Sequence, residues 1–267
     1  MLYKLPANTV ENEELTARLE ILRKEFLDLF TTHKNMVENE SPILSSLYLQ
    51  KLGYLQLELL QIETEVARLK MKMKMIQAAI NRDEKPDLSS IERMVNDQMR
   101  DYYAKIEAQA IELDNAKELL SNLVPAEEMN KLKEVFRILC KRLHPDLNPD
   151  QSEEEKDLFI RVKAAYDLNQ LSELQKILLY LESNKKDNEA PFSADGKREQ
   201  ISHLEGNIES LKIKIEHLKQ SFPFTVGKLI FEEEYIQQRQ SEIKLQIKKS
   251  EEEIEKYQNI INIMTDE

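Results

Sequence analysis

His144 and Asp146 are the residues whose types and spacing could do chemistry, because an imidazole two residues from a carboxylate can exchange protons or bind a metal ion. Either chemistry needs further groups that converge on the pair. The other histidines, His33, His203 and His217, lie in separate segments without ligand spacing around them. The chain also contains no P-loop, no glycine-rich phosphate loop and no nucleophile motif. We therefore expect no catalytic residue, no metal site and no cofactor, and the sequence predicts that the protein is not an enzyme.

Charge, cysteine content and hydropathy exclude several other classes of protein. The formal net charge of -12 over 267 residues disfavours general binding to nucleic acid, whose phosphates attract Lys and Arg. Cys140 is the only cysteine, so neither an internal disulfide nor a zinc site of several cysteines can form. The start of the chain lacks a signal-peptide pattern, and no stretch approaches the roughly 20 apolar residues of a membrane span. These features predict a cytoplasmic protein that binds neither nucleic acid nor membrane.

The composition favours long helices that pack along narrow seams. Charged residues make up 33% of the chain, aromatic residues 6%, and only 4 residues are glycine. Apolar residues recur at heptad steps in several segments. The most regular series alternates steps of three and four and consists of Leu52, Leu55, Leu59, Ile62, Val66, Leu69, Met73, Ile76 and Ile80. The sequence predicts an all-α fold, in which long antiparallel coiled-coil helices flank a small helical hairpin.

Prolines and polar stretches divide the chain into four consecutive parts. We expect a helical coiled-coil arm over residues 1–122, a shorter helical module over 123–182, a linker over 183–196, and a second helical hairpin over 197–267. The heptads leave open whether the seams close within one chain or between two chains, as in a homodimer.

Capping signals predict where the helices of the N-terminal arm begin. Asn8-Thr9 precede the first helix, and Ser41 followed by Pro42 predicts the start of a second. Ser89 and Glu92 form a capping-box pattern at the start of a third. Because only a short loop separates the second helix from the third, these two helices should pack side by side as an antiparallel pair.

Residues 131–177 contain the one pattern that implies a mechanism. The helix expected before the loop has one apolar face, and its other face is basic. That basic face carries Lys133, Arg137, Lys141 and Arg142. This face is positively charged although the chain as a whole is negatively charged, so it would steer an acidic partner toward this helix. Pro145 ends the helix, so His144 and Asp146 are expected to be presented on a loop.

This segment resembles the J-domain of the DnaJ-like co-chaperones. The resemblance spans residues 124–170 and rests on the basic helix, the tripeptide His144-Pro145-Asp146 and a following F-x-x-V-x-x-A-Y helix. Long heptad segments around such a module look like small bacterial J-domain-containing proteins. The resemblance implies docking on a DnaK-type ATPase and stimulation of its ATP hydrolysis. The docking residues would be His144, Pro145, Asp146, Lys133, Arg137, Lys141 and Arg142.

The chain departs from the family outside this segment. The usual short opening helix is missing, and Leu119, Leu120 and Leu123 would have to take its place. No Gly/Phe-rich linker and no cysteine-rich zinc domain follow the module. The resemblance therefore implies contact with the ATPase but no general client binding, and the coiled-coil arms would direct the protein to an unknown client.

Two other functions remain open. A coiled-coil scaffold with an inactive J-like segment would show the same heptads, although it would have no physical need for the tripeptide or the basic face. Binding of nucleic acid would rest on the lysine-rich run over residues 68–77. A simpler interpretation is that Lys70, Lys72 and Lys74 are solvent-exposed residues of a helix, next to its apolar heptad positions.

Overall fold

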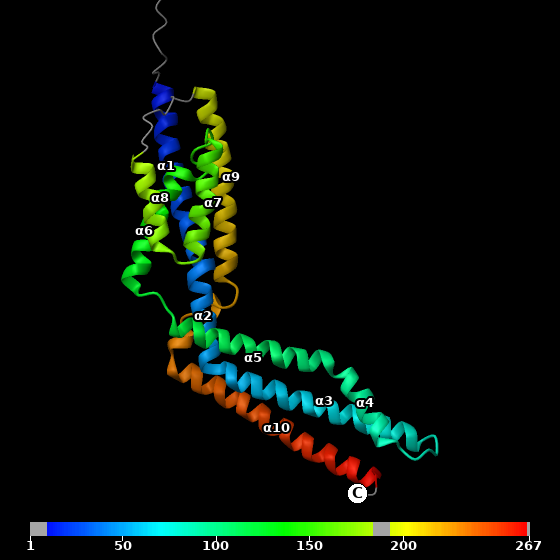
Figure 1. Ribbon diagram of the computed structural model, residues 1–267. Helices are drawn as coiled ribbons and strands as arrows, with labels where there is room; N and C mark the ends of the chain where they lie inside the picture. The colour runs from blue at the N-terminus through cyan, green and yellow to red at the C-terminus, as the bar shows by residue number, and fades with distance from the viewer. Residues whose placement is uncertain (1–9, 184–192, 266–267) are drawn as a thin grey trace, which may run out of the picture. The chain divides into compact units, whose positions relative to one another are not determined.

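The computed structural model describes residues 10–183 and 193–265, and all regular elements within these ranges are helical (Figure 1). The α-helices are α1 (Val10–Asn35), α2 (Ser41–Tyr48), α3 (Tyr54–Ile80), α4 (Leu88–Gln98), α5 (Arg100–Ser121), α6 (Ala126–Leu143), α7 (Glu153–Asp167), α8 (Leu171–Ser183), α9 (Ala194–Lys219) and α10 (Glu233–Thr265). The shorter elements are the π-helical turns η1 (Met36–Glu40) and η2 (Leu49–Gly53), and the 3-10 turns η3 (Phe224–Val226) and η4 (Leu229–Phe231). The predicted all-α fold is confirmed. In the described ranges, no helix combines the length and the apolar composition that crossing a membrane requires.

The chain folds into two compact units, each built from two separate stretches. The first unit combines Met1–Pro42 with Leu123–Phe222, and the second combines Ile43–Asn122 with Pro223–Glu267. The four consecutive parts expected from the sequence do not match this division, since α9 belongs to the first unit and α10 to the second. The segment 197–267, expected to form one hairpin, is thus divided between the two units. A heptad pattern shows that a helix buries a seam, but it does not choose the helix that covers the seam.

In the first unit, α1 and α9 lie side by side and run parallel. Arg18 forms an ion pair with Glu205 at 2.8 Å, and Glu25, one heptad further along α1, pairs with Lys212, also one heptad further along α9, at 2.8 Å. The seam between them buries apolar side chains, which are Leu19, Leu22 and Phe26 of α1 and Leu204, Ile208 and Leu211 of α9. The sequence did not predict that these two helices pair, and their parallel direction differs from the antiparallel arrangement expected of the long helices.

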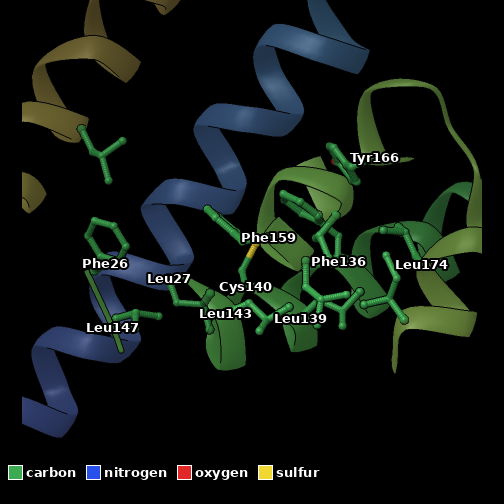
Figure 2. Close-up of a cluster of buried hydrophobic side chains, with 14 of the residues drawn as sticks. Phe26, Leu27, Phe136, Leu139, Cys140, Leu143, Leu147, Phe159, Tyr166 and Leu174 are labelled. Carbon is green, nitrogen blue, oxygen red and sulfur yellow. The ribbon is translucent and has the colours of Figure 1, made fainter. Parts of the chain in front are cut away.

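Helices α6, α7 and α8 complete the core of the first unit, and Figure 2 shows its central side chains. Helix α6 contributes Leu132, Phe136, Leu139, Cys140 and Leu143, while α7 and α8 contribute Phe159, Val162, Tyr166, Leu174 and Ile177. Burial of one such side chain stabilises a fold by about 1.5–3 kcal/mol. Helices α6 and α7 form the helix–loop–helix that the sequence predicted. Leu119, Leu120 and Leu123 are absent from this core, and α1 packs against α6 in their place.

The sequence predicted a break and a new helix start at Ser41, but the backbone is helical through this residue. Ser41 has helical dihedral angles, φ -60° and ψ -49°, and its amide donates to the carbonyl oxygen of Met36, five residues back. Pro42 has no amide hydrogen and would disrupt a regular α-helical turn. The π-helical turn η1 accommodates it, so the backbone stays helical where the sequence predicted a cap. The capping signal at Asn8-Thr9 lies outside the described residues.

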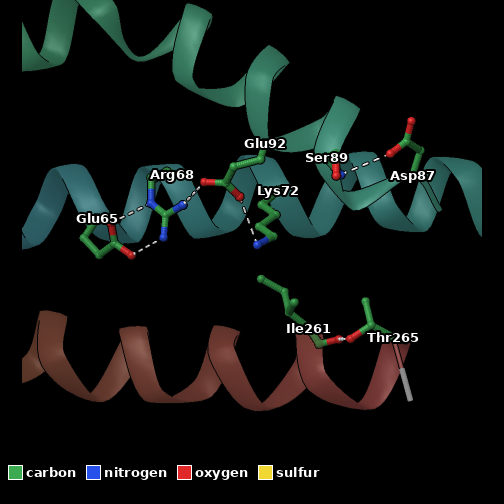
Figure 3. Close-up of polar contacts among 8 residues, drawn as sticks. All are labelled: Glu65, Arg68, Lys72, Asp87, Ser89, Glu92, Ile261 and Thr265. Atoms are coloured by element: carbon green, nitrogen blue, oxygen red, sulfur yellow. Dashed lines mark hydrogen bonds and ion pairs between the residues drawn. The ribbon is translucent and has the colours of Figure 1, made fainter. Parts of the chain in front are cut away.

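In the second unit, α3 packs against α4 and α5 as the predicted antiparallel pair. Arg68 of α3 binds Glu92 of α4 at 2.6 Å (Figure 3), and Gly53, just before α3, lies against Leu113 near the end of α5. Helix α10 covers another side of α3 and runs parallel to it. The buried side chains along this contact include Leu52 of η2, Leu55 of α3, and Ile236, Ile243 and Ile247 of α10.

The start of α4 also differs from the capping box expected at Ser89. The carboxylate of Asp87 accepts a hydrogen bond from the amide of Ser89 at 3.1 Å (Figure 3). It accepts a second one from the amide of Ser90 at 3.2 Å. Asp87 is thus the cap, and α4 begins at Leu88. Glu92 is used for tertiary contacts instead of the cap.

Candidate partner-docking site

The loop between α6 and α7 is a compact turn that satisfies the carbonyl groups at the end of α6. The amide of His144 donates to the carbonyl oxygen of Cys140 at 2.9 Å, and the amide of Asn148 donates to that of His144 at 2.9 Å. The Asn148 side chain donates to the carbonyl oxygen of Lys141 at 3.1 Å. These bonds replace the intrahelical partners that a helix end lacks. Helix α6 ends at Leu143, immediately before His144-Pro145, as the sequence predicted.

His144 is buried in the first unit and not presented to solvent. Only 7% of its surface is exposed, and its ring packs edge-on against three phenylalanine rings. The centroid distances are 4.9 Å to Phe26, 4.4 Å to Phe30 and 5.0 Å to Phe159. Burial, together with the positive charge of Lys163, lowers the pKa of His144 to about 4. The imidazole is therefore neutral at physiological pH.

Asp146 holds the loop through both its backbone and its side chain. Its amide donates to Nδ1 of His144 at 3.1 Å, which makes that nitrogen an acceptor. Its Oδ2 accepts a hydrogen bond from Nδ2 of Asn207 in α9 at 2.9 Å. Partial burial raises the pKa of Asp146, while His203 and the Asn207 bond act in the opposite direction. Only Pro145, among the three residues of the tripeptide, is exposed.

The expected exposure of the tripeptide is thus wrong for His144 and only partly right for Asp146. The physical reason lies in α1 and α9, which cover the loop from one side each. A proline after a helix predicts where the helix ends. It carries no information about which distant helix packs on the loop that follows.

The four basic residues of α6 are in different environments. Arg137 is half-buried and forms an ion pair with Asp28 of α1. Lys133 is also half-buried, whereas Lys141 and Arg142 are exposed and pair with no acid among the described residues. The helix therefore keeps a basic surface, but one of its cations is already neutralised by α1.

A groove of about 730 Å³ runs between α1 and α6 beside these residues. Arg23 and Lys24 of α1 line it together with Arg137 and Lys141 of α6. Glu20 of α1 also lines the groove and pairs with Arg23 at 3.2 Å, so within the described residues Lys24 is the unpaired cation that α1 adds beside the basic surface of α6. Nothing in the heptad pattern indicated that these two helices would share this groove.

The residues that sequence reasoning missed are the partners of the loop: Phe26, Asp28, Phe30 and Asn207. Phe26 and Phe30 stand four residues apart on one face of α1, where the other seam positions are mostly leucine. That aromatic pair was the one available signal. Asn207 gives none, because a single asparagine on a polar helix face is typical of any exposed helix.

Within the described residues, no three His, Cys, Asp or Glu side chains gather closely enough to hold a metal ion. Burial raises the pKa of the Cys140 thiol well above its usual range, so the thiol is not an activated nucleophile.

No protein-family model matches the chain, and neither the curated proteins nor the solved structures contain a significant match to it.

Proposed function

We propose that the protein is a J-domain co-chaperone that docks on a DnaK-type ATPase and stimulates its ATP hydrolysis. The observation that supports this most directly is the helix–loop–helix of α6 and α7, with His144-Pro145-Asp146 at its turn and a basic surface on α6. The remaining helices would direct the ATPase to a client in the cytoplasm.

The exposed cations of α6 suit an electrostatic encounter. Lys141 and Arg142 lie next to the loop and are not paired within the described chain. Opposite charges steer association and select the partner more than they add affinity. At physiological ionic strength the Debye length is about 8 Å, so the proposed stimulation should weaken as salt is added.

A single-turnover ATPase assay with a bacterial DnaK tests this function. The wild-type protein, at saturating concentration and low salt, should raise the hydrolysis rate. His144→Gln should abolish the increase, whereas His217→Gln, an exposed histidine of α9, should retain it. Because His144 is buried, Pro145→Ala provides a second variant at an exposed position, and it should also abolish stimulation with unchanged helical circular dichroism.

The alternative function is a coiled-coil scaffold whose J-like segment is inactive. The burial of His144 among three aromatic rings favours it, since a histidine can occupy such a place for packing alone. If saturating wild-type protein fails to stimulate several DnaK chaperones at low salt, the co-chaperone function is rejected in favour of the scaffold.

A further inference from the structure

We infer that the paired helices α1 and α9 form a clamp that closes the tripeptide loop and must open before an ATPase can dock. This inference rests on the proposed function and adds the regulation of the same site. The clamp comprises α1 and α9 themselves, and its contacts with the loop and α6 come from Phe26, Asp28 and Phe30 of α1 and from Asn207 of α9.

Helix α1 covers the imidazole. The rings of Phe26 and Phe30 meet the His144 ring at centroid distances of 4.9 and 4.4 Å, and Phe30 also stacks on Phe136 of α6 at 6.5 Å. Between these two phenylalanines in the sequence, Asp28 forms an ion pair with the guanidinium of Arg137. A partner that approaches α6 would therefore find this cation already paired and the imidazole out of reach.

Helix α9 occupies the carboxylate. Asn207 donates to Oδ2 of Asp146 at 2.9 Å, and His203, one turn earlier on α9, acts to lower the pKa of the same carboxylate. Three of the groups assigned to docking, on His144, Asp146 and Arg137, thus have a partner from the clamp. Docking through these groups and closure of the clamp exclude each other.

The clamp is built to stay together when it lifts from the loop. Its two helices are joined by contacts that do not involve the loop, among them the Arg18–Glu205 and Glu25–Lys212 ion pairs and a buried apolar seam. The polar contacts with the loop side are few and half-exposed, and such contacts are individually weak. Opening therefore leaves the α1–α9 seam intact. It breaks the contacts of α1 and α9 with the loop, the packing of α1 on α6 and α7, and the ion pair between Lys34 of α1 and Asp167 of α7.

A closed clamp changes affinity but not the maximum response. If only a fraction of the molecules is open, the apparent dissociation constant rises by the inverse of that fraction. Saturating partner still pulls all molecules open. The clamp therefore raises the concentration of protein needed for half-maximal ATPase stimulation and leaves the plateau unchanged.

The double variant Phe30→Ala/Asn207→Ala tests the clamp without altering net charge. It removes one ring from His144 and the hydrogen bond to Asp146. We expect half-maximal stimulation at about a tenfold lower concentration, since the loss of two contacts of this size shifts a two-state equilibrium by about that factor. Leu29→Ala is the matched control, because Leu29 is a half-buried residue of the same helix that packs against the same core.

Alkylation of Cys140 reports clamp opening independently of any ATPase. This sole cysteine is fully buried in the core that α1 helps to close, and Lys34 of α1 is near enough for its charge to act on the thiol. The double variant should react faster than the wild type and the Leu29→Ala control, at unchanged helical circular dichroism.

The two measurements together separate the possible failures. Equal half-maximal concentrations for wild type and double variant would overturn the clamp and leave the co-chaperone function standing. A lower concentration without faster alkylation would also overturn it, because the substitutions would then act on the partner directly. Faster alkylation with no stimulation by either protein would reject the co-chaperone function, and the regulatory role of the clamp would fall with it.

Discussion

The His144 ring is neutral in the folded chain because its surroundings destabilise the protonated form of the imidazole. Its Nδ1 accepts the Asp146 amide, three aromatic rings enclose it, and the charge of Lys163 opposes a second positive charge. Protonation of Nδ1 would cost the hydrogen bond and place a cation in an apolar site. The pKa of His144 falls from its ordinary 6.5 to about 4 for these reasons.

This lowered pKa predicts an acid-sensitive stability. As the pH falls, the unfolded state takes up the proton first, so the stabilisation by neutral His144 is complete above pH 6.5 and is lost toward pH 4. The free energy of unfolding should drop by about 2 kcal/mol between pH 7 and pH 5 from this ring alone, at about 1.4 kcal/mol per pKa unit. Urea titrations at both pH values measure it.

The variant His144→Gln isolates this contribution, because every other titrating group is shared with the wild type. The drop between the two pH values should be smaller in the variant. An identical drop in both proteins would show that the buried ring does not control the acid response.

At the scale of single residues, sequence patterns located the tripeptide, the basic face and the end of α6. They did not show that His144 is buried, since the rings of Phe26 and Phe30 come from a helix more than a hundred positions earlier in the chain. A local motif specifies backbone geometry and residue type. Coverage by a distant helix depends on tertiary packing, which no local spacing records.

At the scale of elements, the parallel register of α1 and α9 has an identifiable polar determinant. Lys197 of α9 is only 8% exposed, and its Nζ donates to Oδ1 of Asn12 at 2.8 Å and to Oγ1 of Thr16 at 2.6 Å, both on α1. A buried polar group in an otherwise apolar seam disfavours any register that leaves it unpaired. Heptads alone do not specify the direction of such a pair, because parallel and antiparallel pairs bury the same positions.

Thr16→Val tests this determinant. The change keeps the side-chain shape but removes one acceptor of the buried Lys197 ammonium group, so the free energy of unfolding should fall by about 1–3 kcal/mol in a denaturant titration. Thr31→Val is the matched control, because its hydroxyl bonds to carbonyl oxygens of its own helix, at Leu27 and Asp28. Equal losses for both variants would contradict a role for Lys197 in pairing the helices.

At the scale of the whole molecule, the chain builds two units from interleaved stretches, which its sequence did not reveal. Composition and heptad spacing predicted an all-helical chain, and the short loop near Pro86 predicted the antiparallel packing of α3 with α4 and α5. The longer connection between α9 and α10 contains η3 and η4, and it leads from one unit to the other. A short loop forces the two helices that it joins to pack side by side. After a longer loop, tertiary packing decides which helix each of them packs against.

The division into units predicts which property a mutation can damage. At Gly53, in the second unit, an added Cβ would lie 2.9 Å from Cδ1 of Leu113 and 3.2 Å from Cδ2 of Leu49, so Gly53→Val overpacks this contact. We expect a loss of about 1–3 kcal/mol in unfolding free energy. Gly206 of α9 has no atom within 4 Å of such a Cβ, and Gly206→Val should change stability by less than about 0.5 kcal/mol.

The Gly53→Val protein should nevertheless stimulate a DnaK-type ATPase as the wild type does at temperatures where it stays folded, because the tripeptide loop and its clamp belong entirely to the first unit. Thermal unfolding and single-turnover hydrolysis, measured on the same preparation, separate the two properties. If Gly53→Val lost stimulation while its helices remained intact, the second unit would be part of the docking surface, and the assignment of that surface to the first unit alone would be wrong.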